Sequence, residues 1–258
     1  MKKTLWIIIL AAVVIGAAVF ALALSGVFSG NGEENVRQDP KTDGWTIITL
    51  DPGHGGKSPG GVGVHNGEEW IERDLVMQLA IYLKDELEKY DKVKVYLTRE
   101  DGTENPELYE RVKMGKRNRS DAVISLHLNG GNGKRSGASA LVTHGKYDPE
   151  GLKETEDGLA LSILKEIEAQ MGIKSNGLYL ADSKKVTYPN GEAADYYGIV
   201  RSGIYLGIPA ILIEHCYLDN EYDFESCLSS DAKLRALAKA DADGIAAYYG
   251  LELKTEDE

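Results

Sequence analysis

Residues 46–56 read TIITLDPGHGG, a β-branched run that stops at a loop rich in proline and glycine. β-branched residues favour strands, and Pro/Gly clusters mark where strands end. Two later stretches have the same form: AVISLH at 122–127 and PAILIE at 209–214. Each apolar run closes on, or shortly before, a polar residue: His54, His127 and Glu214, respectively. The sequence therefore predicts three buried strands that end in residues able to bind a metal or move a proton.

Helical patterns lie between these strands. Apolar residues at helical spacing predict a helix over about 70–89. Further helices are expected over 105–120, 149–172 and 231–250, and further strands over 92–99 and 137–144. Residues 173–209 are less regular, with a possible strand at GLYLA followed by an irregular excursion. Alternating strands and helices predict an α/β fold, a single domain whose twisted, mainly parallel sheet is flanked by helices.

The N-terminal 28 residues have a different character. Lys2 and Lys3 precede an uncharged run over residues 4–28, long enough to cross a bilayer core of about 30 Å as a helix. This favours an uncleaved membrane anchor over a cleaved signal peptide, and both place the rest of the chain outside the cytoplasm. Residues 29–44 are expected to be a polar linker and residues 45–258 the folded domain.

Charge and cysteine content restrict the possible partners. The net charge of −12 argues against a nucleic-acid partner, which usually requires a basic patch. Two cysteines, Cys216 and Cys227, are too few for a cysteine-rich metal site. Outside the cytoplasm they could form a disulfide, or they could be two buried thiols.

A hydrolytic zinc site would account for the polar strand ends. Ligands of open α/β sheets gather at the carboxyl ends of the strands, and catalytic zinc takes three protein ligands and keeps a position for water. His54 and His127 need one more ligand, and the candidates are His65, Glu68, Glu69 and Glu72. Glu72 shares a helical face with apolar residues, so a counter-charge must stabilise its carboxylate there. Glu68 and Glu69 precede the helix and are expected to be solvated.

The remaining polar residues near these motifs have ordinary structural explanations. His65 and His144 are expected to be structural, and His215 should point to the opposite face of its strand from Glu214. Asp51 is expected to brace the loop or a histidine ring nitrogen rather than bind metal. Glycines 53, 55 and 56 allow the backbone to approach a metal and a substrate closely. The chain has neither a dinucleotide fingerprint nor a phosphate loop.

At these residues the sequence resembles the zinc-dependent N-acetylmuramoyl-L-alanine amidases of the amidase_3 type, which cleave peptidoglycan. The matching stretches, in family order over about residues 46–247, are LDPGHGG, the glutamate of IERDLVMQLA, YLTRED, ELYERVKMGKRNRSDAVISLHLNG and GIPAILIEHCYLDN. The resemblance implies an α/β sandwich around a mixed, twisted sheet, with peptidoglycan as substrate and Zn²⁺ as cofactor. It also implies His54, Glu72 and His127 as metal ligands and Glu214 as the catalytic glutamate.

The chain departs from the family pattern at Ser58, where an acidic residue is common, and at CYLDN. The loop after His54 is also longer than usual, which keeps Glu68 and Glu69 as rivals of Glu72. We expect these changes to affect the substrate rim more than the metal, and substrate preference rather than the reaction. Asn129 is a candidate for orienting ligand or substrate, and Arg201 for binding a peptide carboxylate.

Two other functions remain open at this point. The same fold could serve as a non-catalytic wall-binding or regulatory module, or as a zinc hydrolase of another amide.

Overall fold

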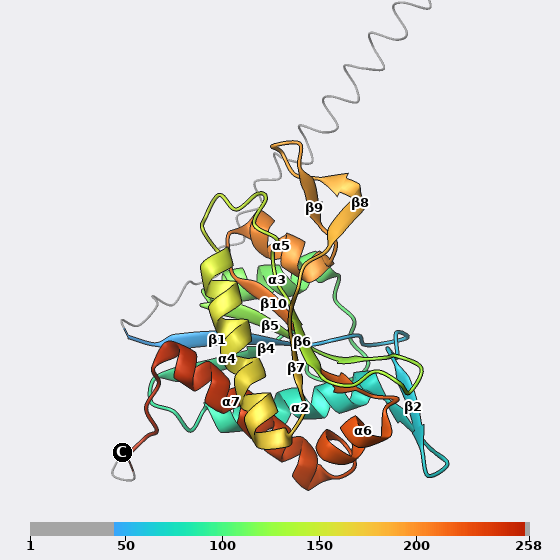
Figure 1. Cartoon of the computed structure of the whole chain (residues 1–258). Coiled ribbons are helices and arrows are strands. Elements are labelled where there is room, and N and C mark those ends of the chain that lie inside the picture. Colours follow the sequence, from blue (N-terminus) through green and yellow to red (C-terminus); the bar gives the residue numbers. More distant parts are fainter. Residues whose placement is uncertain (1–43, 256–258) are drawn as a thin grey trace, which may run out of the picture. The chain divides into compact units, whose positions relative to one another are not determined.

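A six-stranded sheet forms the centre of the protein, which the computed structural model describes from residue 44 to residue 255 (Figure 1). The strand order is β4-β1-β5-β10-β6-β7. These strands are β1 (Thr46–Pro52), β4 (Val93–Leu97), β5 (Ala122–Asn129), β6 (Ala138–Leu141), β7 (Ser175–Tyr179) and β10 (Ala210–Tyr217). β5 is buried along almost its whole length, as expected of a strand covered on both faces.

The sheet is mainly parallel, with one antiparallel step. β1 pairs in parallel with β4 and β5, and β5 pairs in parallel with β10. β6 runs antiparallel to β10, and β7 continues parallel to β6. The connection from β5 to β6, residues 130–137, is shorter than the dozen or so residues that a parallel crossover needs. The sheet is therefore mixed.

Helices cover both faces of the sheet. One core unites the sheet with three helices, α2 (Glu72–Leu87), α4 (Lys153–Met171) and α7 (Asp231–Tyr249). A second core, on the face opposite α2 in Figure 1, involves α3 (Leu108–Arg117) and α5 (Gly198–Leu206). The ends of α4 and α7 agree with the sequence prediction, because Gly172 and Gly250 take the left-handed conformation that terminates a helix.

The predicted start of α2 at residue 70 is wrong by two residues. Trp70 and Ile71 belong to β3 (Glu68–Ile71), which pairs antiparallel with β2 (Val62–His65). The turn between them is Asn66-Gly67, and both residues have positive φ, 53° and 84°. Asn-Gly is the strongest short-range hairpin signal, so this hairpin could have been read from the sequence.

The segment predicted to be an irregular excursion contains a hairpin and a helix. β8 (Asp182–Thr187) pairs antiparallel with β9 (Ala193–Asp195), and α5 follows. The carboxylate of Asp195 accepts hydrogen bonds from the hydroxyl of Tyr188, within the hairpin, and from that of Thr143, far away in the chain. The contact with Thr143 ties the hairpin to the rest of the domain. Such contacts leave no local periodicity. The short helix α6 (Glu221–Cys227) was likewise not predicted.

The two cysteines are buried free thiols, one in β10 and one in α6. A hydrogen bond with Cys227, together with burial, raises the pKa of the Cys216 thiol well above its ordinary value. The Cys216 sulfur is therefore a poor nucleophile.

The predicted N-terminal anchor, residues 1–28, lies outside the described residues, as does nearly all of the predicted linker. Between residues 44 and 255, no helix has both the length and the apolar character needed to cross a membrane.

Candidate functional site

The polar strand ends meet at one edge of the sheet. His54 follows β1, which pairs with β5, the strand of His127. Glu214 of β10 is the direct register partner of His127. Because these strands are parallel, their carboxyl ends share one edge, where α/β proteins bind ligands.

Three side chains converge at this edge in the geometry of a metal site. The ligand atoms of His54, Glu72 and His127 all lie within 4.8 Å of one another. Glu72 Oε1 is 3.0 Å from Nε2 of His54 and 3.0 Å from Nδ1 of His127. The two imidazole rings meet edge to face, with centroids 4.8 Å apart. The predicted ligand set is thus brought together by the fold.

The donor set fits zinc in chemistry and in size. Two imidazole nitrogens and one carboxylate oxygen are common ligands of hydrolytic zinc, at about 2.0–2.2 Å from the metal. Tetrahedral donors at that distance are about 3.3 Å apart, so the two 3.0 Å separations need to open by only a few tenths of an ångström. The His54 and His127 side chains remain 24% and 18% exposed, which leaves one side of the group accessible.

Backbone donors orient the Glu72 carboxylate. Gly61 N donates to Oε2 at 2.6 Å, and Leu128 N donates to Oε1 at 2.9 Å. Burial alone would raise the pKa of Glu72, but hydrogen bonds from His127, His54 and Gly61 outweigh it and hold the pKa well below its usual range. Glu72 is therefore a buried anion, as a metal ligand must be.

The charge of the group also affects His127. Burial on its own would lower the pKa of this imidazole, whereas its hydrogen bond with Glu72 and the nearby Glu214 carboxylate raise it, and the net direction is upward. The two carboxylates therefore favour a positive charge on the His127 ring.

Two buried arginines hold the loop that carries His54. Arg111 Nη1 donates to Asp51 Oδ1 at 2.8 Å, and its Nη2 donates to the carbonyl oxygen of His54 at 2.6 Å. Arg99 donates to the carbonyl oxygens of Pro52 and Gly53, both at 2.9 Å. His54 has a positive φ of 63°, so these contacts fix a backbone conformation that is rare for a non-glycine residue.

Asp51 braces this loop, one of the two roles expected of it. Its carboxylate accepts hydrogen bonds from Arg111 and from Ser125 Oγ, the latter at 2.6 Å. Sequence reasoning gave no separate role to Arg99 or Arg111. The only sequence signal for a role of these arginines was that they lie in two of the stretches that resemble the family, YLTRED and ELYERVKMGKRNRSDAVISLHLNG.

Two glycines are required by the close packing of the ligands. A Cβ at Gly53 would lie 2.4 Å from the His127 ring, and one at Gly60 would lie 2.5 Å from Glu72 Oε2. Both separations are below any tolerable contact, so a side chain at either position would displace a ligand.

Glu214 lies beside the three ligands without being one of them. Its Oε2 is buried and has no hydrogen-bond partner among the described residues. Burial raises the pKa of Glu214, and Glu72 adds to this, while the histidines act in the opposite direction. A carboxylate with an uncommitted oxygen next to a metal site suits a proton acceptor for an attacking water.

Ser58 contacts one of the three ligands, whereas its departure from the family pattern was expected to affect the rim more than the metal. Its Oγ is 3.3 Å from Nδ1 of His54. An acidic residue here would pair with the ring nitrogen that does not face Glu72, and such a partner raises the basicity of a metal-bound histidine. Serine supplies a neutral partner instead.

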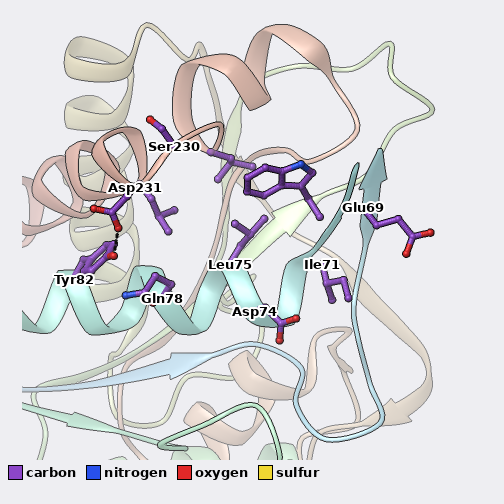
Figure 2. A pocket seen from close by; sticks show the side chains of 11 residues that line it. Glu69, Ile71, Asp74, Leu75, Gln78, Tyr82, Ser230 and Asp231 are labelled. Carbon is purple, nitrogen blue, oxygen red and sulfur yellow. Dashed lines mark hydrogen bonds between the residues drawn. The ribbon is translucent and has the colours of Figure 1, made fainter. Parts of the chain in front are cut away.

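The rival carboxylates lie away from the group. Glu68 and Glu69 are exposed residues of β3. Glu69 lines a separate hollow of about 390 Å³ between α2 and the start of α7, shown in Figure 2, where Asp231 accepts a hydrogen bond from Tyr82. Glu72 is not among the residues that line this hollow.

The other histidines have structural partners, as expected. His65 is buried and stacks on Phe224 at 3.7 Å, with Nε2 2.7 Å from the carbonyl oxygen of Leu218. His144 Nε2 is 3.0 Å from the carbonyl oxygen of Ala193. His215 points away from Glu214, and its Nε2 is 2.9 Å from Asp241 of α7.

Substrate roles for Asn129 and Arg201 remain predictions. Asn129 is partly buried at the end of β5, and its carbonyl oxygen accepts a hydrogen bond from Leu218 N at 2.9 Å. Arg201 Nη1 donates to the carbonyl oxygens of Asp195 and Tyr196, at 2.6 and 3.1 Å. Only the remaining donors of Arg201 are available to a ligand.

The fold and this edge define an α/β protein with a candidate metal site of the kind found in metal-dependent hydrolases. Comparison with known proteins identifies the family. Residues 48–247 match the Amidase_3 family, described as N-acetylmuramoyl-L-alanine amidase, and the chain belongs to this family.

Individual relatives agree with the family match. The chain is 28% identical to N-acetylmuramoyl-L-alanine amidase AmiA of Escherichia coli (strain K12), over 92% of this chain and 90% of AmiA. It is 29% identical to AmiC of Escherichia coli O6:H1, over 79% of this chain, and spans about half (52%) of the length of AmiC.

Solved structures show the same fold. Cwp6 from Clostridium difficile superimposes with a TM-score of 0.66 at 25% identity, over 80% of this chain and 30% of Cwp6. The catalytic domain of the amidase CwlV from Bacillus (Paenibacillus) polymyxa var. colistinus gives 0.63 at 22% identity, over 80% and 99% of the two chains.

Proposed function

We propose that the protein is a zinc-dependent peptidoglycan hydrolase that cleaves the amide bond between N-acetylmuramic acid and the L-alanine of the stem peptide. The observation that carries this proposal is the convergence of His54, Glu72 and His127. Beside them lies Glu214, whose Oε2 has no hydrogen-bond partner among residues 44–255. Membership of the amidase family supports the choice of bond.

In the proposed mechanism each residue has one role. His54, Glu72 and His127 would hold the zinc ion. Zinc, when bound, polarises a carbonyl group and makes water a nucleophile at neutral pH. Glu214 accepts the proton of the attacking water and passes it to the leaving alanine nitrogen. The raised pKa of Glu214 suits this role, because the carboxyl must hold the proton between the two transfers.

Digestion of purified cell wall by the full-length protein tests the reaction. We expect new alanine amino termini, which disappear with a chelator and return when zinc is added. Glu214→Gln should lower the rate by about 10²–10⁴-fold, since it removes the proton acceptor. Glu225→Gln changes an exposed glutamate of α6; it is the matched control and should leave the rate unchanged.

Digestion by Glu214→Gln at the same rate as by the wild type would refute the proposal. Release of a different amino terminus would indicate that another amide is the substrate. Binding to the wall without cleavage would indicate a non-catalytic module.

Metal analysis tests the ligand set separately. We expect stoichiometric zinc in the wild type, loss of zinc in Glu72→Gln and His127→Ala, and retention in Glu69→Gln. Loss of zinc from Glu69→Gln but not from Glu72→Gln would reverse the assignment of the carboxylate ligand.

We further propose that residues 1–28 anchor the chain, that residues 29–44 form a linker, and that residues 45–258 form a catalytic domain facing the wall. The sequence pattern of the first 28 residues supports this organisation. Fractionation of cells that express the full chain should find it in the membrane, with the domain digested by protease added outside. A chain lacking residues 2–28 should stay in the cytoplasm.

A further inference from the structure

The row of polar residues at the sheet edge continues beyond Glu214. Glu214 pairs with His127 on one side and with Ser139 of β6 on the other. Directly opposite residues of an antiparallel pair project from the same face, with Cβ atoms about 5 Å apart. Ser139 therefore lies next to the carboxylate that we assign to proton transfer.

Ser139 also forms one wall of a hollow of about 370 Å³. The hollow is further lined by Arg135, Asn176, Leu178, Tyr179 and Tyr217. An extended peptide advances about 3.3 Å per residue, so a substrate bound at Glu214 would reach this hollow within about two residues of the scissile amide.

The loop that carries Arg135 is held in place by two carboxylates. Asp219 accepts hydrogen bonds from the backbone of Gly131 and Gly133, at 3.0 and 3.1 Å for its Oδ2. Asp223 accepts one from Gly137 N at 3.0 Å. These contacts fix the backbone on both sides of Arg135, so the backbone position of Arg135 is set before a ligand binds.

Arg135 is an exposed residue of this loop. Within residues 44–255 it takes part in no hydrogen bond or ion pair, unlike Arg201, which already donates to two backbone carbonyls. A guanidinium presents a planar fork of donors that matches a carboxylate. Tyr179, which is 55% exposed, adds an aromatic face to the same hollow.

We propose that Arg135 binds a free carboxylate on the stem peptide, on the residue that follows the alanine of the scissile bond, and thereby selects carboxylate-bearing stems over amidated ones. This inference rests on the proposed function. It assigns substrate selectivity to a loop outside the metal ligands.

Two matched substrates test the assignment. They are muramyl peptides that differ only at the second residue, which carries either a free α-carboxylate or an α-carboxamide. We expect the full-length wild type to prefer the carboxylate by about tenfold or more in kcat/KM, mainly through KM, because a charge-assisted bidentate pair is lost with the amide. Arg135→Gln should remove this preference by weakening only the carboxylate substrate, and Arg135→Lys should retain part of it.

Lys134→Gln is the control, because it removes the same charge from the neighbouring exposed residue, which does not line the hollow. It should leave the preference intact. The assignment would be overturned if Arg135→Gln lowered kcat/KM equally for both peptides. It would also be overturned if this variant lost activity only on whole walls that carry anionic polymers. A wild type that cleaves both peptides at equal rates would refute the role of Arg135 and leave the proposed function standing. A wild type that cleaves neither peptide nor wall would refute the proposed function itself.

Discussion

Replacing Arg111 by lysine measures how strongly the buried ion pair holds the His54 loop. The side chains of Arg111 and Asp51 are 2% and 1% exposed. The guanidinium donates five hydrogen bonds, one of them to the carbonyl oxygen of His54. Lysine keeps the charge but lacks the planar fork, so it can replace only some of these bonds.

The expected cost follows from these contacts. Removing one partner of a buried pair typically costs about 3–5 kcal/mol, and each hydrogen bond to a charged group contributes about 1.5–3 kcal/mol. Because lysine retains the charge, we expect Arg111→Lys to lower the unfolding free energy by about 3 kcal/mol. Domains of this kind are stable by about 5–15 kcal/mol, so the variant should still fold.

Urea unfolding in the presence of a chelator measures this change without a contribution from metal. Zinc affinity, measured by titration, should fall by about 10–100-fold, because Arg111 supports a ligand without touching the metal. Arg117→Lys is the matched control, an exposed arginine on the same helix, and should change the unfolding free energy by less than about 0.5 kcal/mol. A change of that small size in Arg111→Lys, with unaltered zinc affinity, would refute the bracing role of this ion pair.

Three further predictions concern the ligands and a buried carboxylate. Gly53→Ala should weaken zinc binding at least tenfold in a titration, since the added Cβ would lie 2.4 Å from the His127 ring. Gly130→Ala is the control and should leave zinc binding unchanged, because a Cβ at that position has no atom within 4 Å. Zinc at 100 times its Kd should raise the unfolding free energy by about 2.7 kcal/mol, and His127→Ala should abolish this zinc dependence in thermal melts. Burial raises the pKa of Glu156 from 4.5 to about 8, although two backbone N–H donors act in the opposite direction. The contribution of the neutral Glu156 carboxyl to the unfolding free energy is therefore complete below about pH 4.5 and is lost as the pH rises to about 8. Within this window the unfolding free energy should fall by up to about 1.4 kcal/mol per pH unit. Glu156→Gln cannot titrate, so its unfolding free energy relative to wild type should rise across this window; a difference that does not vary with pH would contradict the assignment.

Much of the candidate site could be predicted from local sequence because its residues follow strong local patterns. His54, His127 and Glu214 each end an apolar strand, and parallel topology alone requires such ends to meet. Glu72 was selected by its place on the apolar face of a helix, and it does point inward. These inferences need only strand and helix periodicity.

The missed elements differ in whether a signal was present. The hairpin at Asn66-Gly67 carries a recognised turn signal and could have been predicted. The β8–β9 hairpin carries none, since it depends on contacts between Asp195 and residues elsewhere in the chain. The reversed direction of β6 also had a signal, because residues 130–137 are too few for a parallel crossover.

The sequence by itself determined the α/β class and the amidase resemblance. It also indicated the four residues of the proposed catalytic group, with Glu68 and Glu69 left as rivals of Glu72. Only the tertiary structure decided the roles of the arginines. Arg111 is buried against Asp51, sixty positions away in the chain, whereas Arg201 donates to backbone carbonyls. Arg135 lines a hollow and has no hydrogen-bond or ion-pair partner among residues 44–255. The residues next to each arginine in the sequence do not reveal which of these states it takes. Whether a charge is paired, buried or available depends on the groups that folding brings within hydrogen-bond distance.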